Sequence, residues 1–265
     1  MEPGSLSVTG RAARVAFVVP VYNHAQTVSE VIRGLRPYGC PIVVVDDGST
    51  DGTGRVLDAQ PGIQLLRHPV NRGKGAALLT GMAAAAASAD FAISIDADGQ
   101  HDPADAGVFL EAADRGQRLI AIGCRRGMQG PHTPWTSRFG RGFSNFWVRA
   151  AGGPRTRDSQ SGYRLYPLPE VLELGTHARR FQWEVEVLVK AHWKGLPVVD
   201  LPVGVAYQPR GQRISHFRPF VDFWRNAAAF SALFFMRLFV PSAIRARRRA
   251  RAGLAEGGRD EAAGD

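Results

Sequence analysis

The chain has 265 residues, with 45% apolar and 22% charged residues and a formal net charge of +9, so it is long enough for one large or two small globular domains. Its two cysteines, Cys40 and Cys124, exclude a disulfide framework and a cysteine-based metal site. The positive charge favours an anionic partner: nucleic acid, a membrane surface or a phosphorylated substrate.

The N-terminal segment has no targeting signal. Residues 1–10 lack the charged start and apolar stretch of a signal peptide. The chain also contains no uncharged apolar run of about eighteen residues, the length needed to cross a bilayer. We therefore expect a cytoplasmic protein with residues 1–12 as a flexible N-terminus.

Apolar strands and amphipathic helices alternate through the first hundred residues. Short apolar runs predict strands at 15–21, 41–45 and 63–67, and a fourth strand that leads into Asp96. Helical spacing of apolar residues predicts helices at 27–35, 53–60 and 76–88. This alternation predicts an α/β fold: a mostly parallel, Rossmann-like sheet with helices on both faces.

Polar side chains follow three of these strands. They are Tyr22, Asn23, Asp46, Asp47, Asp96 and Asp98. Parallel sheets bind ligands at the carboxyl ends of their strands. The sequence therefore predicts one shared site at that edge.

The pair Asp96 and Asp98 is the most informative part of this edge. Residues two apart on an extended chain point to the same side, and convergent carboxylates repel unless a cation lies between them. Gly99 permits a sharp turn, and Gln100 adds a neutral oxygen ligand. A cation held here would bridge a diphosphate, which makes a nucleotide-linked substrate the first hypothesis. An ordinary solvated Asp-Gly turn is the alternative.

Better-known nucleotide-binding motifs are absent. The chain has no P-loop signature, and Gly73-Lys74-Gly75 neither follows the first strand nor has the third glycine of a dinucleotide fold. Residues 96–99 also resemble the nucleophile loop of haloacid-dehalogenase phosphatases. That loop usually lies near the N-terminus, so a phosphatase is a distant alternative.

Four segments together resemble family 2 glycosyltransferases of the GT-A fold. They are VVPVYN at 18–23, VVDDGSTDG at 44–52, NRGKG at 71–75 and DADGQHDP at 96–103. DSQSGYR at 158–164 and FQWEVE at 181–186 are similar to motifs of the polyprenyl-phosphate branch, which includes dolichol-phosphate mannosyltransferase. The resemblance implies a GT-A domain at 13–216.

The resemblance also implies a set of donor-binding residues. They are Pro20, Tyr22, Asp46, Asp47, Lys74 and Asp96, with the first two framing the nucleobase and an aspartate of 46–47 bonding to the base or ribose. Asp96, Asp98 and Gln100 would hold Mg²⁺ or Mn²⁺ against the donor diphosphate. Such a cation offsets the charge on the departing nucleotide.

The candidates for catalytic and acceptor-binding roles all follow the fourth expected strand. The resemblance assigns catalysis to Asp98, Glu184 and Asp158, with Glu184 the first candidate for a general base if the acceptor is a hydroxyl. Glu184 and Glu186 lie two apart on an expected helix at 181–192, so at most one faces the site. A phosphate acceptor is already anionic, so it needs positively charged residues to position it and no general base. Arg125 and Arg164 are candidates for binding that phosphate, and Arg164 lies on an expected strand.

A loop at 208–216 resembles the family's basic acceptor loop. Arg210 and Ser215 are in register, whereas Arg213 replaces a glycine and His216 replaces a lysine. Arg210, Arg213 and a protonated His216 could still hold an anion.

The C-terminal region is aromatic and then basic. Residues 217–252 combine phenylalanines, tryptophan and leucines with an arginine cluster, which is typical of an amphipathic helix on an anionic membrane surface. A helix docked on the core with a solvated tail is the alternative. Nucleic acid is not expected, because no recognition fold surrounds the cluster. Residues 253–265 are expected to be disordered.

The sequence therefore predicts an inverting, metal-dependent hexosyltransferase, peripheral on the inner face of the cytoplasmic membrane. Its donor would be a GDP- or UDP-linked sugar and its acceptor most simply polyprenyl phosphate. A hydroxyl of a glycolipid, of a cell-envelope polysaccharide precursor or of an aryl-polyene-type lipid is the second acceptor. A non-catalytic sugar-nucleotide binder is the alternative from another class. The base, the sugar and the oligomeric state are left open.

Overall fold

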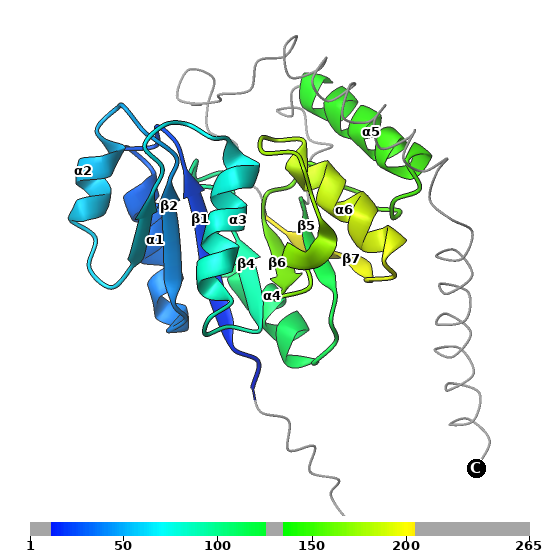
Figure 1. Ribbon diagram of the computed structural model, residues 1–265, viewed down its shortest axis with the longest axis horizontal. Helices are drawn as coiled ribbons and strands as arrows, with labels where there is room; N and C mark the ends of the chain where they lie inside the picture. The colour runs from blue at the N-terminus through cyan, green and yellow to red at the C-terminus, as the bar shows by residue number, and fades with distance from the viewer. Residues whose placement is uncertain (1–11, 126–134, 205–265) are drawn as a thin grey trace, which may run out of the picture.

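The computed structural model describes residues 12–125 and 135–204, and within them seven strands form one mixed sheet (Figure 1). The strands are β1 (Val15–Val21), β2 (Ile42–Asp46), β3 (Gln64–Arg67), β4 (Phe91–Ser94), β5 (Ile120–Arg125), β6 (Arg164–Pro167) and β7 (Val198–Val203). Their order is β3-β2-β1-β4-β6-β5-β7. Only β6 runs antiparallel to its neighbours, β4 and β5.

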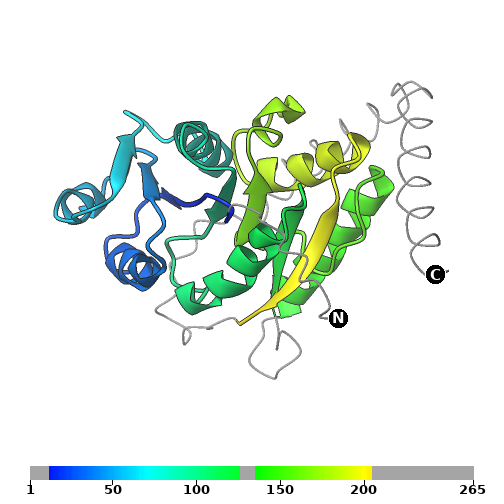
Figure 2. The ribbon, with the colours of Figure 1, turned by 90° about the horizontal axis from the view of Figure 1, so that it is seen from below.

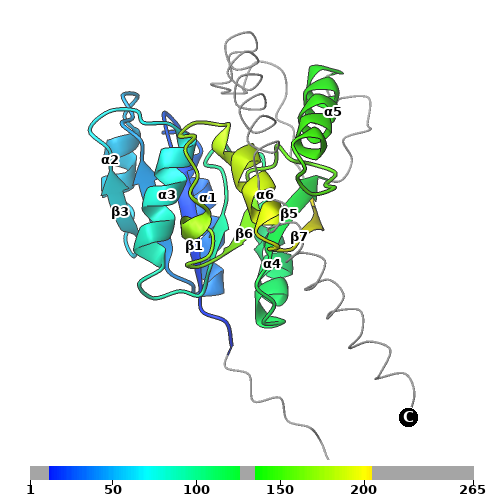
Figure 3. The ribbon, with the colours of Figure 1, turned by 45° about the vertical axis from the view of Figure 1, so that its right-hand side comes forward.

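Helices cover both faces of the sheet. They are α1 (Val28–Leu35), α2 (Thr53–Asp58), α3 (Lys74–Ala85), α4 (Ala106–Asp114), α5 (Trp135–Ala150) and α6 (Trp183–Trp193), with short 3₁₀ turns at η1 (Arg36–Tyr38), η2 (Pro103–Asp105) and η3 (Leu172–Leu174). Figure 2 shows α1 and α4 on one side and α3 and α6 on the other. Helix α5 lies outside this sandwich, against α6 (Figure 3).

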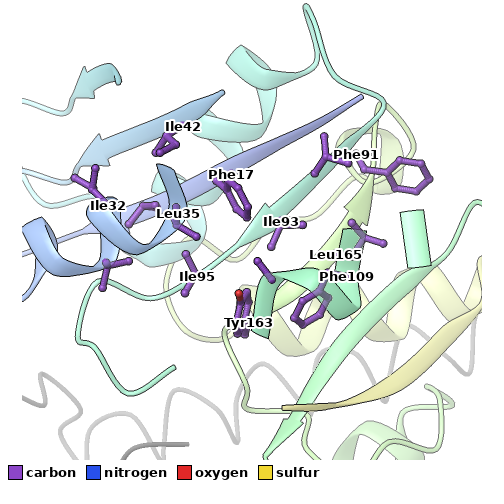
Figure 4. Packing of buried hydrophobic residues seen from close by; sticks show 14 of the residues in the cluster. Phe17, Ile32, Leu35, Ile42, Phe91, Ile93, Ile95, Phe109, Tyr163 and Leu165 are labelled. Atoms are coloured by element: carbon purple, nitrogen blue, oxygen red, sulfur yellow. The ribbon is translucent and has the colours of Figure 1, made fainter. Parts of the chain in front are cut away.

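Alternate side chains of β1 pack into two separate hydrophobic cores, one on each face of the sheet. Phe17 packs with α1 and α4 on one face, as Figure 4 shows, whereas Val18 packs with α3 on the other. Every residue of β1 is buried, because a parallel strand with helices on both faces meets no water. This explains why the strand is a continuous apolar run in the sequence.

Helix α3 approaches the sheet closely because its facing residues are small. A Cβ at Gly81 would lie 2.5 Å from Cγ1 of Val18 and 3.1 Å from Cγ2 of Val45. Gly75 is similarly close to α6, where an added Cβ would lie 2.4 Å from Cβ of Trp183. Gly75 and Gly81 therefore allow the close packing that places the first residue of α3, Lys74, near the strand ends.

The fold predicted from the sequence is confirmed. The four strands and three helices of the first half appear at the expected places, except that the helix expected at 76–88 begins at Lys74 and ends at Ala85. Its earlier start follows from Gly73, whose φ of 100° lies in a region open to glycine. The strand expected at Arg164 is β6, and the helix expected at 181–192 is α6.

Three predictions about the termini concern residues that lie largely outside the described part of the chain. The N-terminal segment is described only from residue 12, and the amphipathic segment at 217–252 and the tail at 253–265 lie beyond residue 204. Within residues 12–125 and 135–204, no helix has the length and apolarity required to cross a bilayer.

We expect Gly81→Ala to lower the free energy of unfolding by about 1–3 kcal/mol, because its methyl group would overpack the contact with Val18. Gly107→Ala is the matched control, since a Cβ on that helical glycine of α4 meets nothing within 4 Å. The control should raise stability by about 0.4–1 kcal/mol. Urea denaturation followed by circular dichroism measures both, and equal values would show that α3 is not packed as described.

Candidate functional site

The carboxyl ends of β1, β2 and β4 lie at one edge of the sheet, since these neighbouring strands are parallel. Side chains tie the loops of this edge together. Asn23, after β1, accepts a hydrogen bond from the backbone of Thr50 at 2.7 Å and donates its own N–H to Oγ of Ser49 at 3.0 Å. Thr27 donates to the carbonyl of Ala97 at 2.5 Å, which joins the start of α1 to the loop after β4.

Lys74 is the centre of the charged cluster at this edge. Its Nζ lies 2.7 Å from Oδ1 of Asp96 and 2.9 Å from Oε1 of Glu184. Lys74 is the first residue of α3, Asp96 follows β4, and Glu184 lies in the first turn of α6. One ammonium group therefore connects three elements that are distant in the sequence.

Burial and charge act against each other in this cluster. Burial alone would lower the pKa of Lys74, but the carboxylates of Asp96 and Glu184 outweigh it and hold that pKa above its ordinary value. Burial would likewise raise the pKa of Asp96, but Lys74 lowers it overall. Lys74 is thus a cation and Asp96 an anion at neutral pH.

A glycine makes room for the pair. A Cβ at Gly162 would lie 2.3 Å from Oδ2 of Asp96 and 2.6 Å from Nζ of Lys74. The carbonyl of Gly162 accepts a hydrogen bond from the buried hydroxyl of Ser94 at 2.7 Å, which fixes the glycine loop over the end of β4. The glycine of the 158–164 motif therefore has a steric role beside the charged pair.

Asp98 and Gln100 lie in the loop that continues from Asp96. The carboxylate of Asp98 accepts hydrogen bonds from the backbone N–H of Gln100 at 3.0 Å and from its Nε2 at 2.8 Å. Asp96, Asp98 and Gln100 are all half-buried, so they are accessible from outside.

These three residues suit a hard divalent cation. They offer oxygen atoms, and the amide nitrogen of Gln100, not its oxygen, makes the bond to Asp98. In the described part of the chain no three Asp, Glu, His or Cys residues gather into a full ligand cage. Mg²⁺ sites commonly use one or two carboxylates and take their remaining ligands from water and substrate phosphates.

Asp47 serves the protein's own structure. Its carboxylate accepts from the backbone N–H groups of Arg72 at 2.9 Å and Gly73 at 2.7 Å, and it lies 2.6 Å from Nδ1 of His68. The side chain is almost wholly buried, so it fixes the loop that leads into Lys74. Asp46 is also buried and accepts from the backbone of Ser49. Their predicted contact with the nucleobase or ribose stays a prediction, without support from these bonds.

Asp158 and Arg125 form a buried pair. The guanidinium group donates from Nε at 2.6 Å and from a terminal nitrogen at 2.8 Å, and the Asp158 side chain has no exposed surface. This geometry binds β5 to the loop before β6. It gives Asp158 a structural role, and its predicted role as a base finds no support in its contacts.

Arg164 is wholly buried and donates to three backbone carbonyls. They belong to Ser161 at 2.6 Å, Glu184 at 2.7 Å and Ser159 at 2.8 Å. Arg164 therefore clamps the glycine loop to α6. A direct contact with a phosphate, as predicted, is not supported by this position.

The two glutamates of α6 diverge, as the sequence indicated. Glu184 faces Lys74, whereas Glu186 pairs with Lys190 at 2.7 Å and accepts from the backbone of His177 and Ala178. Only Glu184 joins the cluster at the strand ends. The sequence did not point to His68, and its one signal is its place directly after the strand β3.

The remaining predicted residues are placed as follows. Pro20 is buried in β1, and Tyr22 is half-buried directly after it. Arg210, Arg213 and His216 lie outside the described residues. His101, in the DADGQHDP motif, is buried, and burial lowers its pKa to about 4, so it is neutral near pH 7.

Comparison with known proteins identifies similar chains. A family model described as "Glycosyl transferase family 2" matches residues 16–166. An uncharacterized protein of Methanocaldococcus jannaschii is 33% identical over 204 residues, which cover 73% of this chain and 82% of the relative. Polyprenol monophosphomannose synthase of Mycolicibacterium smegmatis is 30% identical over 205 residues, 72% of this chain and 76% of the relative.

A solved structure has the same fold. The mannosyltransferase of Pyrobaculum calidifontis, determined in complex with GDP-Man and Mn²⁺, aligns with a TM-score of 0.50 at 18% identity. The alignment covers 92% of this chain and 81% of that one. The matches include the segment around Asp96, so the phosphatase alternative has no support from them.

We expect Asp47→Asn to lower the free energy of unfolding by about 1–3 kcal/mol, because an amide NH₂ would face one of the buried N–H donors. Asp58→Asn is the control: Asp58 pairs with Arg67 on the surface, and its loss should cost about 0–1 kcal/mol. Chemical denaturation measures both. A ligand-contacting Asp47 would instead leave stability unchanged and weaken nucleotide binding, which would contradict the structural role.

Proposed function

This chain belongs to glycosyl transferase family 2, and on that premise we propose that it moves a hexose from a nucleotide diphosphate sugar to polyprenyl phosphate. The observation that carries the proposal is the position of Asp96 and Asp98 at the carboxyl end of β4, beside Lys74 of α3 and Glu184 of α6. The loops that surround them are fastened by internal hydrogen bonds. Such a preorganised charged edge suits an anionic, nucleotide-linked donor.

Asp96, Asp98 and Gln100 would hold Mg²⁺ or Mn²⁺ beside the donor diphosphate. When bound, the cation would offset the negative charge of the departing nucleoside diphosphate. The solved mannosyltransferase of the same fold was determined with GDP-Man and Mn²⁺, which supports this class of donor and metal.

The role of Glu184 depends on the acceptor. A phosphate monoester is already anionic, so no base is required and Glu184 would serve mainly to hold Lys74. The name of the Mycolicibacterium smegmatis relative, which describes the synthesis of polyprenol monophosphomannose, supports a phosphate acceptor. Because Arg125 and Arg164 bind internal groups, we propose the basic loop with Arg210, Arg213 and His216 for the acceptor phosphate.

A hydroxyl acceptor is the second candidate, and one observation favours it. Glu184 is a carboxylate that contacts the same ammonium group as Asp96, so a residue of the type that serves as a general base lies beside the proposed donor site. The membrane-associating segment predicted at 217–252 would bring either lipid acceptor to the enzyme.

We expect nucleotide sugars of one base, GDP- or UDP-linked, to stabilise the protein only when Mn²⁺ is present. At about 100 times the Kd the stabilisation should be about 2.7 kcal/mol, seen as a rise in Tm in a thermal-shift assay. Asp98→Ala should abolish the rise. Asp102→Ala is the control, because that exposed side chain only caps the turn η2. Equal shifts for wild type and Asp98→Ala would contradict the assigned site.

We expect labelled sugar to reach polyprenyl phosphate and not the corresponding polyprenol when the full chain is assayed in detergent with the stabilising donor. Arg210→Ala should raise KM for the lipid more than KM for the donor, because it would remove a charge from the acceptor phosphate alone. Thin-layer chromatography of the lipid fraction measures transfer. Transfer to polyprenol that is lost in Glu184→Gln would favour the hydroxyl acceptor instead.

A further inference from the structure

Lys74 is shared between two carboxylates that differ in accessibility. Asp96 retains 25% of its side-chain exposure, whereas Glu184 retains 7% and Lys74 itself 14%. Both contacts are close, at 2.7 Å and 2.9 Å. The ammonium group therefore occupies an oxygen of Asp96, the residue expected to bind the cation.

The charges of this cluster are unbalanced. A single ammonium group faces the two carboxylates of Asp96 and Glu184, and Asp98 adds another negative charge in the adjoining loop. The carboxylates of Asp96 and Asp98 oppose the approach of a diphosphate that enters alone. A divalent cation that enters alone meets an oxygen already bound by Lys74. Each ligand is thus opposed in the absence of the other.

We propose that Lys74 is an internal counterion that holds Asp96 in the donor-free protein and releases it when the donor diphosphate and the cation bind together. This inference rests on the proposed function. The diphosphate supplies a new anionic partner for the ammonium group, and Asp96 is then released to the cation. The coupling is reciprocal, so the donor tightens cation binding by the same factor as the cation tightens donor binding.

The burial of the two carboxylates indicates which contact is exchanged. Glu184 is the more buried, and Lys74 is the one described cation in direct contact with its carboxylate, so loss of that contact would leave a poorly compensated charge away from water. Asp96 is the more exposed and precedes Asp98 and Gln100 in the same loop. Lys74 therefore keeps Glu184 as its anchor and exchanges Asp96 for phosphate oxygen.

Removal of the charge at residue 74 tests the exchange. The free Mn²⁺ signal in electron paramagnetic resonance reports Mn²⁺ binding to the full chain, alone and with the nucleoside diphosphate of the stabilising donor class. Wild type should bind Mn²⁺ weakly alone and about tenfold or more tightly with nucleotide, a typical coupling. Lys74→Met should bind Mn²⁺ alone more tightly than wild type and lose most of the nucleotide effect. Titrations without protein correct for Mn²⁺ held by free nucleotide.

Lys190→Met is the matched control. Lys190 forms a buried pair with Glu186 on the same helix as Glu184, at 2.7 Å, but faces the 175–178 loop instead of Asp96. Loss of the Lys190 charge should leave the affinity for Mn²⁺, and the effect of nucleotide on that affinity, as in wild type. Lys74→Arg, which keeps the charge, should also keep Mn²⁺ binding weak without nucleotide.

The results that would overturn the counterion exchange differ from those that would overturn the proposed function. Unchanged Mn²⁺ affinity in Lys74→Met, or unchanged coupling, overturns the counterion exchange while leaving the proposed function intact. Absence of any coupling between nucleotide and Mn²⁺ in wild type overturns both. If Lys74→Met does not fold, Lys74→Gln replaces it, because its amide can still donate to Glu184, and the same expectations apply.

Discussion

The pairing of Lys74 with Asp96 and Glu184 is the contact on which the site depends. It joins the start of α3, the end of β4 and the start of α6 through one ammonium group. Lys74 and Glu184 are largely withdrawn from water, so loss of either charge would leave the other uncompensated, at a cost of about 3–5 kcal/mol for a buried pair. The stability of the fold and the proposed donor site therefore depend on the same atoms.

Small residues create the space for this pairing. Gly75 lets α3 approach Trp183 of α6, and Gly162 lets its loop pass beside Asp96 and Lys74. A side chain at either glycine would separate elements that must touch. The cluster therefore depends on the absence of a side chain at these two glycines as much as on its charged groups.

Other charged groups at the same edge are used inside the protein. Asp47 fixes the loop before Lys74, Asp158 binds Arg125, and Arg164 holds backbone carbonyls. Buried polar groups need hydrogen-bond partners, and the side chains of Asp47, Asp158 and Arg164 are bonded to groups of the same chain. Asp96 and Asp98 remain half-exposed, and this difference in burial separates the residues that shape the edge from those that can meet a ligand.

Periodicity along local stretches of chain predicts the α/β fold, the shared edge of strand ends and the divergence of Glu184 from Glu186. Motifs in a fixed order indicate the family. The contact between Lys74 and Glu184, 110 residues apart, becomes visible in the folded chain, as does the inward position of Asp47, Asp158 and Arg164. Burial and partner choice depend on which distant loops meet, and local spacing carries no information about that.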